Sequence, residues 1–211
     1  AFPLRSRRMT DGTLRVASVA RLVPKKGLEH GIQAVAAMHS SVRYTIVGDG
    51  PERPHLHSLI QRLGMEGKIE LSGWKTHADV AALLDSSHVL LAPSVTAPDG
   101  DEEGIPVALM EAMASGMPVL STIHSGIPEL VEDGVSGFLV PEGHVPLLTS
   151  RLEWLQSHPS HWEWMGRAGR RTIESSYSAP LLNDRLVQII RSVRRTEDLR
   201  QPDSMAAHGT T

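Results

Sequence analysis

The fold is organised around residues 102–116, which read EEGIPVALMEAMASG. A glycine and then a proline follow two carboxylates, and proline is favoured at the first position of a helix, so a loop carrying Glu103 is predicted to turn into a helix near Pro106. Every residue from 107 to 114 except Glu111 is apolar, which predicts a buried helix that carries one carboxylate. Because an ionised carboxylate is costly to bury alone, Glu111 requires a cation, a set of hydroxyl donors or a ligand that brings them.

The start of this predicted helix is also a candidate anion site. The amide groups of its first turn have no acceptor within the helix, and they point back toward Glu103, Gly104 and Ile105. Such a terminus favours anions, including phosphate. The stretch therefore combines a carboxylate in need of partners with a site for a phosphate group.

Short apolar segments alternate with helical patterns on both sides of this stretch. Six strands are predicted, over residues 14–20, 44–47, 69–71, 88–92, 118–121 and 137–140. This alternation predicts an α/β, Rossmann-like three-layer domain with a six-stranded, mostly parallel sheet. Ligands bind at the carboxyl ends of the strands in such sheets, and a polar loop over residues 93–104, unusually long for a connection, leaves from one of those ends.

The chain is predicted to have four parts. Residues 1–12 resemble the end of a linker, residues 13–177 form a ligand-binding domain, residues 178–195 form a C-terminal helix, and residues 196–211 form a flexible tail with little to bury. The sequence opens on alanine rather than methionine, so we expect the chain to be a piece of a longer protein.

Composition excludes several classes of site. A formal net charge of -3 on 211 residues gives no reason to expect a nucleic-acid partner. The absence of cysteine excludes disulfides and thiolate zinc sites and fits a cytoplasmic protein, and no apolar run approaches the roughly 18 residues that span a bilayer. The eleven histidines form close pairs only at His55 with His57 and at His158 with His161, neither with a third ligand nearby, so no metal site is predicted.

Two cations follow the first predicted strand. Arg21 and Lys26 lie five residues apart, at the same end of the sheet as the helix at Pro106. An arginine can hold two phosphate oxygens at once and a lysine adds a point charge, so together with the helix start they could hold a diphosphate. The alternative is that both are solvated loop cations.

Two further loops are candidates. Gly48 and Gly50 form a tight turn after the second strand, where the backbone could approach a ligand closely; the alternative is a purely structural turn. The turn lacks the G-x-G-x-x-G dinucleotide fingerprint, which argues against hydride transfer. Trp74 and Lys75 follow the third strand and could frame a base, or Trp74 could pack in the core.

Glu103-Gly104-Ile105-Pro106, with Glu111 eight positions after Glu103, resembles the E-x7-E motif of retaining GT-B glycosyltransferases of family 4. This group includes many bacterial exopolysaccharide and lipopolysaccharide transferases. Other segments agree with it in order and spacing, among them Ala20-Arg21-Leu22, Val47-Gly48-Asp49-Gly50-Pro51 and Gly126-Ile127-Pro128-Glu129-Leu130-Val131. The resemblance extends from about residue 14 to residue 177.

The resemblance implies that residues 13–177 are the donor-binding domain, the C-terminal half of a GT-B enzyme. It implies that Arg21 and Lys26 hold the donor diphosphate, that Glu111 bonds the ribose hydroxyls and that Glu103 faces the donor sugar. Glu103, Arg21 and Lys26 are thus the catalytic candidates.

The resemblance also implies that the backbone around Gly104, Ile105 and Pro106 lies against sugar and phosphate. The sequence departs from the family pattern at two positions. Glu102 duplicates the first acidic position of the motif, so it could substitute for Glu103. His144 stands where many members have an aspartate as a helix cap.

The implied reaction is retaining transfer of a hexose from a UDP- or GDP-type sugar to a glycan or lipid-linked acceptor, without a metal. The acceptor domain is expected to precede this chain, so the chain alone should bind donor and transfer little sugar. The complete enzyme is expected in the cytoplasm, and peripheral attachment to the inner face of the membrane is a further expectation. Two alternatives stay open: a non-catalytic module that binds nucleotide sugars, and a GT-B-like sugar-nucleotide epimerase.

Overall fold

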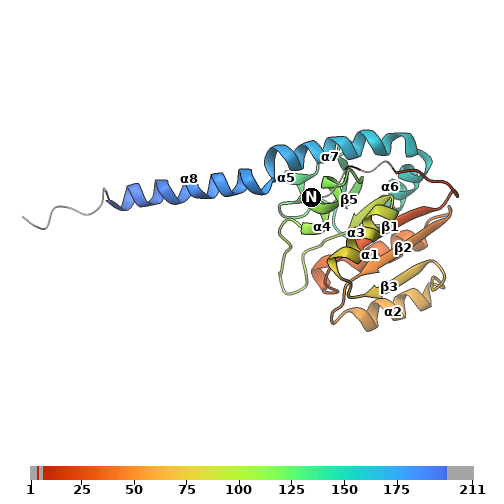
Figure 1. The fold of residues 1–211 in the computed structure, drawn as a ribbon. Helices are drawn as coiled ribbons and strands as arrows, with labels where there is room; N and C mark the ends of the chain where they lie inside the picture. Colours follow the sequence, from red (N-terminus) through yellow and green to blue (C-terminus); the bar gives the residue numbers. More distant parts are fainter. Residues whose placement is uncertain (1–3, 5–6, 199–211) are drawn as a thin grey trace, which may run out of the picture. The chain divides into compact units, whose positions relative to one another are not determined.

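A six-stranded, entirely parallel sheet forms the centre of the computed structural model, which describes residue 4 and residues 7–198 (Figure 1). The strands are β1 (Leu14–Val19), β2 (Val42–Val47), β3 (Ile69–Gly73), β4 (Val89–Ala92), β5 (Val119–Thr122) and β6 (Gly137–Val140), in the spatial order β3-β2-β1-β4-β5-β6. The order reverses between β1 and β4, as in doubly wound nucleotide-binding folds. The predicted α/β fold is therefore confirmed.

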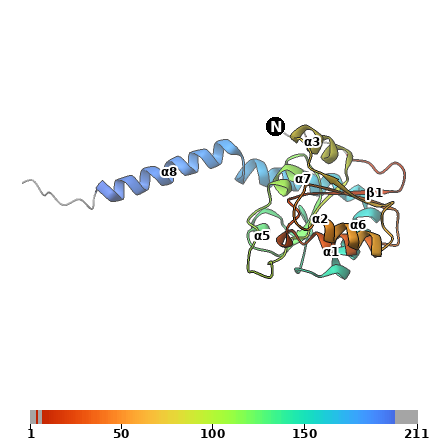
Figure 2. The same ribbon diagram turned by 90° about the horizontal axis from the view of Figure 1, so that it is seen from below.

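Helices connect successive strands and cover both faces of the sheet. They are η1 (Pro24–Lys26), α1 (Leu28–Ala36), α2 (Arg53–Arg62), α3 (His77–Ser86), α4 (Val107–Ala114), α5 (Ile127–Leu130), α6 (Val145–Ser157), η2 (Pro159–His161), α7 (Trp162–Ser176) and α8 (Ala179–Asp198). Figure 2 shows α1, α2 and α6 together on one side of the sheet, with α3 on the other. Both faces of each central strand are thus removed from water, which explains the continuous apolar runs in the sequence.

The largest part of the core lies between the sheet and the layer of α1, α2 and α6. Ile32 of α1, Leu56 of α2 and Leu152 of α6 are 2% exposed or less and belong to one cluster with buried strand residues such as Val16 and Tyr44. Burying each such side chain contributes about 1.5 to 3 kcal/mol relative to leaving it in water. This packing holds the carboxyl ends of the strands, and the loops that leave them, in fixed positions.

The central helix begins near Pro106, as predicted. Its first residue is Val107, and Pro106, which has an extended backbone (ψ 127°), serves as the N-cap. The helix is buried on only one face: Leu109, Ala112 and Met113 are inaccessible, whereas Val107 is 62% exposed. The prediction of a buried helix therefore holds for one face only, because alanine and valine on the outer face are tolerated there without burial.

The chain divides into two units, residues 1–173 and residues 174–211. The second unit contains the end of α7 and all of α8, whose exposed apolar residues include Leu186 and Ile189. The first three residues of the predicted tail, 196–198, belong to α8. The rest of the tail, residues 199–211, lies outside the described part of the chain, as do residues 1–3 and 5–6 of the predicted linker. No helix among the described residues is both long and apolar enough to cross a membrane.

Candidate functional site

A pocket of about 650 Å³ opens at the carboxyl ends of β1 and β2, next to the position where the strand order reverses. Parallel α/β sheets bind ligands at this position. The pocket is lined by Val19, Ala20, Arg21, Lys26, Val47, Gly48, Asp49, Trp74, Lys75, Val80, Glu103, Ile105, Pro106, Val107, Ala108 and Glu111. Segments that are far apart in the sequence therefore meet around one cavity.

Most of the predicted site residues line this pocket. The structure brings together Arg21, Lys26, Gly48, Trp74, Lys75, Glu103, Ile105, Pro106 and Glu111. Gly50 and Gly104 do not line it, nor does Glu102, which is exposed. Glu102 thus lies where it cannot replace Glu103 without a rearrangement of the loop.

The two glycines after β2 hold two loops together. Gly48 has φ 132°, and a Cβ on it would lie 1.9 Å from the carbonyl oxygen of Ala20; a Cβ on Gly50 would lie 2.3 Å from that of Leu22. Both glycines are thus required for the loop after β1 to approach the loop after β2. This observation favours the structural alternative for Gly50, while Gly48 also contributes to the pocket wall.

Lys26 and Glu103 form an ion pair across the pocket, with their side chains only 17% and 14% exposed. Lys26 is the last residue of η1, and Glu103 comes from the loop before α4. The pair neutralises one cation and one carboxylate of the pocket. It is the kind of contact that a charged ligand group can replace.

The other charged residues of the pocket wall are less constrained. Arg21 is exposed, and no carboxylate among the described residues lies within ion-pair distance of it. Lys75 is exposed beside Trp74, which is 75% exposed, so Trp74 does not pack in the core. An exposed indole at the edge of a polar pocket offers a flat apolar surface to a ring of similar size.

Glu111 lies on the pocket wall and is partly buried. Burial raises the pKa of Glu111 above its ordinary value, and the nearby charge of His77 lowers it in part. A group with this shift gains from partners that favour its ionised form, such as hydroxyl donors. The expectation that Glu111 requires donors stays a prediction, and its helix is less buried than predicted.

The N-terminus of α4 forms another part of the wall. Pro106 has no amide hydrogen, and the amide of Leu109 donates to the carbonyl oxygen of Pro106 at 3.0 Å. No side chain caps this terminus. The positive end of the helix therefore faces the pocket beside Lys26, where an anion is favoured.

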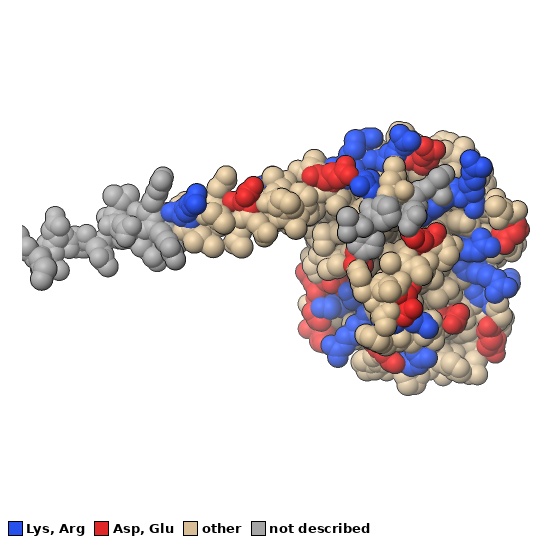
Figure 3. Space-filling view, viewed as in Figure 1, with Lys and Arg blue, Asp and Glu red and all other residues tan. Residues whose placement is uncertain are grey.

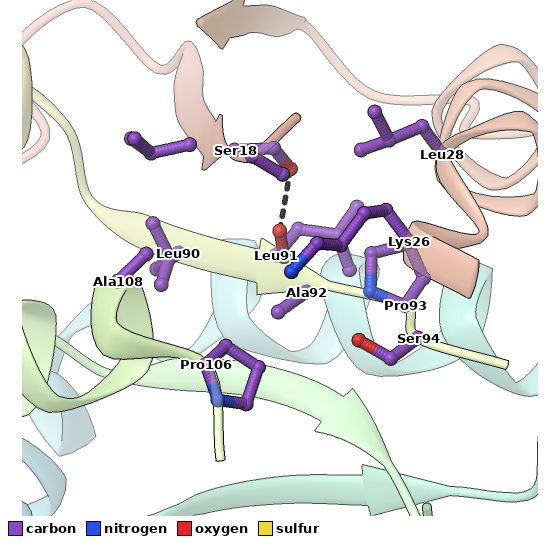
Figure 4. Close-up of a pocket in the computed structure, with 12 residues that line it drawn as sticks. Ser18, Lys26, Leu28, Leu90, Leu91, Ala92, Pro93, Ser94, Pro106 and Ala108 are labelled. Carbon is purple, nitrogen blue, oxygen red and sulfur yellow. Dashed lines mark hydrogen bonds between the residues drawn. The ribbon is translucent and has the colours of Figure 1, made fainter. Parts of the chain in front are cut away.

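A smaller cavity of about 20 Å³, enough for about one water molecule, adjoins the pocket and shares Lys26, Pro106 and Ala108 with it. Figure 4 shows the Lys26 side chain extending across the end of β4 toward α4, with Ser18 nearby. The hydroxyl of Ser18 donates to the carbonyl oxygen of Leu91. This cavity is too small for an organic ligand, so the larger pocket is the candidate site.

The long loop over residues 93–104 is fixed by several contacts. The amide of Val95 donates to the carbonyl oxygen of Lys25 at 2.9 Å, and the Lys25 amino group lies 3.0 Å from the Asp101 carboxylate and 3.1 Å from the Glu102 carbonyl oxygen. The carboxylate of Glu142 accepts from the amide of Thr96 at 2.8 Å. The loop therefore has a defined course that presents Glu103 to the pocket.

Sequence reasoning missed His124, which follows β5. Its side chain is 1% exposed, its Nδ1 lies 2.5 Å from the carboxylate of Glu142, and its Nε2 accepts from the backbone N–H of Glu103 at 3.0 Å. The available signal was a histidine three residues after a predicted strand, at the same sheet edge as the other candidates. His144, by contrast, caps α6 by accepting from the amide of Leu147 at 3.2 Å, which explains how it serves in place of aspartate.

Charges outside the pocket are mixed. On the face shown in Figure 3, basic and acidic side chains are interspersed and neither sign forms a continuous field. Within the described residues there is also no group of three or more histidine, aspartate or glutamate side chains placed to hold a metal ion.

Comparison with known proteins gives one consistent family. The family model described as Glycosyl transferases group 1 matches residues 5–172. WcaL of Salmonella typhimurium, named as a putative colanic acid biosynthesis glycosyltransferase, is 42% identical over 196 residues, which cover 91% of this chain and 48% of WcaL. The amylovoran biosynthesis glycosyltransferase AmsK of Erwinia amylovora is 40% identical over 192 residues, which cover 90% of this chain and 47% of AmsK.

Solved structures agree with this result. Alr3699/HepE of Anabaena, determined in complex with UDP and glucose, superposes with a TM-score of 0.77 at 26% identity, covering 86% of this chain and 49% of that one. Sucrose-phosphate synthase of Thermosynechococcus elongatus superposes with the same TM-score at 22% identity, over 87% of this chain and 46% of that one, and shows the fold alone. The resemblance drawn from the sequence is thereby confirmed. The chain spans about half the length of the curated relatives it matches.

Proposed function

We propose that this chain, which belongs to the group 1 glycosyl transferases, contributes the nucleotide-sugar donor site of its enzyme. The observation that carries the proposal is the convergence of Arg21, Lys26, the N-terminus of α4 and the partly buried Glu111 on one pocket of about 650 Å³. A nucleoside diphosphate sugar needs all of these features. It has a doubly charged diphosphate, a ribose with two hydroxyl donors, a flat base and a sugar.

The diphosphate occupies the region between Arg21, Lys26 and the start of α4 in this proposal. Departure of the diphosphate develops negative charge, and preorganised cations and helix amides stabilise such charge most effectively in a partly enclosed site. This arrangement supports transfer that does not depend on a metal ion. Arg21 supplies a fork for two oxygens and Lys26 a point charge.

The nucleoside lies toward β2 and β3. Glu111 accepts hydrogen bonds from the ribose hydroxyls, which stabilise its ionised form, and Trp74 and Lys75 frame the base. The base is proposed to be uracil, because HepE of Anabaena, with 26% identity, was determined with UDP. The colanic acid and amylovoran relatives support bacterial polysaccharide assembly as the process.

Glu103 faces the sugar part of the pocket, where the E-x7-E resemblance supports a retaining transfer of a hexose. The acceptor, a glycan or a lipid-linked saccharide, is bound mainly by a further domain of the complete enzyme, since the relatives are about twice as long as the matched region. A lipid-linked acceptor would bring the complete enzyme to the cytoplasmic face of the membrane. On this proposal the chain by itself binds donor and transfers little sugar.

Isothermal titration of the chain with UDP, GDP and ADP tests the donor site. We expect saturable binding of one nucleotide, weakened roughly 10- to 100-fold in Arg21→Ala and in Glu111→Ala, the range for hydrogen bonds to charged groups. Arg62→Ala and Glu66→Ala, at exposed positions away from the pocket, are matched controls that should bind like the wild type. Equal affinities in all five proteins would place the nucleotide elsewhere and refute the assignment.

A product assay separates the proposed transferase from the two alternatives. The chain joined to the N-terminal half of a relative such as WcaL should release UDP and glycosylate an acceptor with retention of anomeric configuration. Binding without any transfer would support the nucleotide-sugar-binding module. Conversion of one UDP-sugar into its epimer without an acceptor would support the epimerase.

A further inference from the structure

A buried histidine connects the sugar-facing loop to the rest of the fold. His124 is the second residue after β5, with its side chain 1% exposed, and its Nε2 accepts a 3.0 Å hydrogen bond from the backbone N–H of Glu103. On the other side of the ring, Nδ1 lies 2.5 Å from the carboxylate of Glu142. The ring therefore bridges two residues that are 39 positions apart in the sequence (142 − 103).

These two contacts assign the proton of the imidazole. Nε2 must carry a lone pair, because it accepts from an amide, so in the neutral ring the proton is on Nδ1 and is donated to Glu142. A carboxylate that accepts from one ring nitrogen fixes both the tautomer and the orientation of the ring. Glu142 thus determines that His124 presents an acceptor to Glu103.

Glu142 is itself held in place. It accepts from the backbone N–H of Thr96 at 2.8 Å, at the other end of the long loop that carries Glu103. Burial raises the pKa of Glu142, but the hydrogen bonds from Thr96 and His124 lower it more, so the net pKa lies below its ordinary value and the carboxylate is ionised at neutral pH. The chain of contacts from Thr96 through Glu142 and His124 to Glu103 spans both ends of that loop.

Lys26 alone cannot orient Glu103 during catalysis. Lys26 holds the Glu103 side chain through an ion pair, but the proposed diphosphate draws on the same amino group. The contact with His124 uses the backbone of Glu103, so it persists when the side chain turns to the sugar. The orientation of Glu103 toward the sugar then depends on His124.

We propose that His124, with its tautomer fixed by Glu142, is a positioning residue that holds the backbone of Glu103 so that its carboxylate faces the donor sugar. The proposal rests on the function proposed above. It assigns no contact between His124 and the donor, since His124 does not line the pocket. Loss of His124 should therefore affect recognition of the sugar much more than recognition of the nucleotide.

Two substitutions at position 124 separate the hydrogen bond with Glu103 from the hydrogen bond with Glu142. Glutamine at position 124 can place its side-chain oxygen near the Nε2 position and accept from Glu103. Asparagine is shorter; it can donate to Glu142 from near the Nδ1 position but does not reach Glu103. His124→Gln should therefore keep the hydrogen bond from the Glu103 backbone that His124→Asn loses. His39→Asn, at an exposed position, is the matched control.

The first measurement compares affinities for UDP and UDP-glucose, or for GDP and GDP-mannose if GDP is the nucleotide that binds. We expect all variants to bind the nucleotide within about twofold of the wild type. We expect His124→Asn to lower the additional affinity contributed by the sugar by about 3-fold or more, and His124→Gln to recover most of it. The proposal would be overturned if the sugar contributed the same affinity in His124→Asn as in His124→Gln. It would also be overturned if His124→Asn lost as much affinity for the nucleotide as for the nucleotide sugar, since that result indicates a merely structural role.

The second measurement needs no ligand. Amide hydrogen exchange should be at least about tenfold faster at Glu103 in His124→Asn than in the wild type, and close to wild type in His124→Gln and His39→Asn. Unchanged exchange at Glu103 in His124→Asn would overturn the positioning role even if the protein binds nucleotide. If instead no nucleotide binds to the wild type while exchange follows the expected order, the donor-site function fails and only the structural link from His124 to Glu103 stands.

Discussion

The amino group of Lys26 contacts the carboxylate of Glu103 and thereby joins the turn after β1 to the loop before α4. Both groups are candidates for the chemistry of the pocket, yet in the ion pair each neutralises the other. A diphosphate that approaches Lys26 meets the carboxylate already bound to it. A donor diphosphate bound as proposed above must therefore displace Glu103 from Lys26 or share Lys26 with it.

This competition predicts opposite effects of two substitutions. Glu103→Gln removes the competing carboxylate, so UDP should bind about 2- to 5-fold more tightly, an effect of the size expected for one partly solvated charge pair. Lys26→Met removes the cation and should weaken UDP roughly 10- to 100-fold. Calorimetry on both variants measures the effect, and Lys68→Met, at an exposed position, controls for the loss of one positive charge.

The opposite effect of Glu103→Gln on UDP binding would contradict this competition. If Glu103→Gln weakens UDP as much as Lys26→Met does, then Glu103 binds the nucleotide rather than competing with it. The ion pair would in that case be part of the bound state.

Glu111→Gln should separate stability from function. Burial raises the pKa of Glu111, so the ionised carboxylate destabilises the folded state at neutral pH, whereas a neutral amide does not. The variant should therefore have a melting temperature at least equal to that of the wild type at pH 7, while its affinity for UDP falls roughly 10-fold or more. Calorimetric melting and titration of the same two proteins provide both values.

The same shift predicts a pH dependence. A carboxyl group with a raised folded-state pKa contributes stability that is fully present below its unfolded pKa of 4.5 and is lost as the pH rises through the folded value. The melting temperature of Glu111→Gln relative to wild type should thus increase from about pH 4 to pH 7. A difference that stays constant over this range would show that the carboxylate of Glu111 is not destabilised by burial.

Most of the fold could be predicted from sequence because its signals are local. Apolar runs such as 89–92 and turn formers such as Gly48 mark strands and their ends within a few residues, and a parallel α/β sheet follows from their alternation with helices. The prediction of a helix that starts near Pro106 is confirmed, with Pro106 at the N-cap and Val107 as the first helical residue. The exposure of Val107 was missed because an apolar side chain does not report which face of a helix is covered.

The sequence predicts which residues line the pocket, but it does not predict which of them contact each other. Arg21, Lys26 and Glu111 could be placed at one sheet edge, since every loop after a parallel strand leaves from that edge. The pairing of Lys26 with Glu103, and of His124 with the Glu103 backbone, depends on the course of a 12-residue loop over residues 93–104. Loop paths are determined by contacts between distant residues, so periodicity carries no information about them.

The buried hydroxyl pair of Ser18 and Tyr44 should respond asymmetrically to substitution. The Ser18 hydroxyl donates to the Leu91 carbonyl oxygen and lies 2.7 Å from the Tyr44 hydroxyl, so it accepts from Tyr44. Burial raises the pKa of Tyr44 well above its ordinary value, so the phenol stays neutral and remains a donor. Ser18→Ala leaves this buried donor without its acceptor and should cost about 2 to 3 kcal/mol of unfolding free energy, against about 1 kcal/mol for Tyr44→Phe, which leaves Ser18 bonded to Leu91. Urea unfolding measures both, and a larger cost for Tyr44→Phe would contradict the assigned direction of the hydrogen bond.

Gly27 should be far less replaceable than Gly64, although both have a left-handed backbone, with φ 57° and φ 65°. At Gly64 a Cβ meets nothing within 4 Å, so alanine costs only the backbone strain, about 1 kcal/mol. At Gly27 the Cβ would lie 2.0 Å from the carbonyl oxygen of Pro93, so η1 and the start of the long loop must separate, and the cost should be about 3 kcal/mol or more. Because that separation also displaces Lys26, we expect Gly27→Ala to weaken UDP binding under conditions where it remains folded, whereas Gly64→Ala keeps wild-type affinity. Urea unfolding and calorimetry on this pair of variants check both statements, and equal unfolding free energies would mean that the two loops are not in the close contact on which the pocket depends.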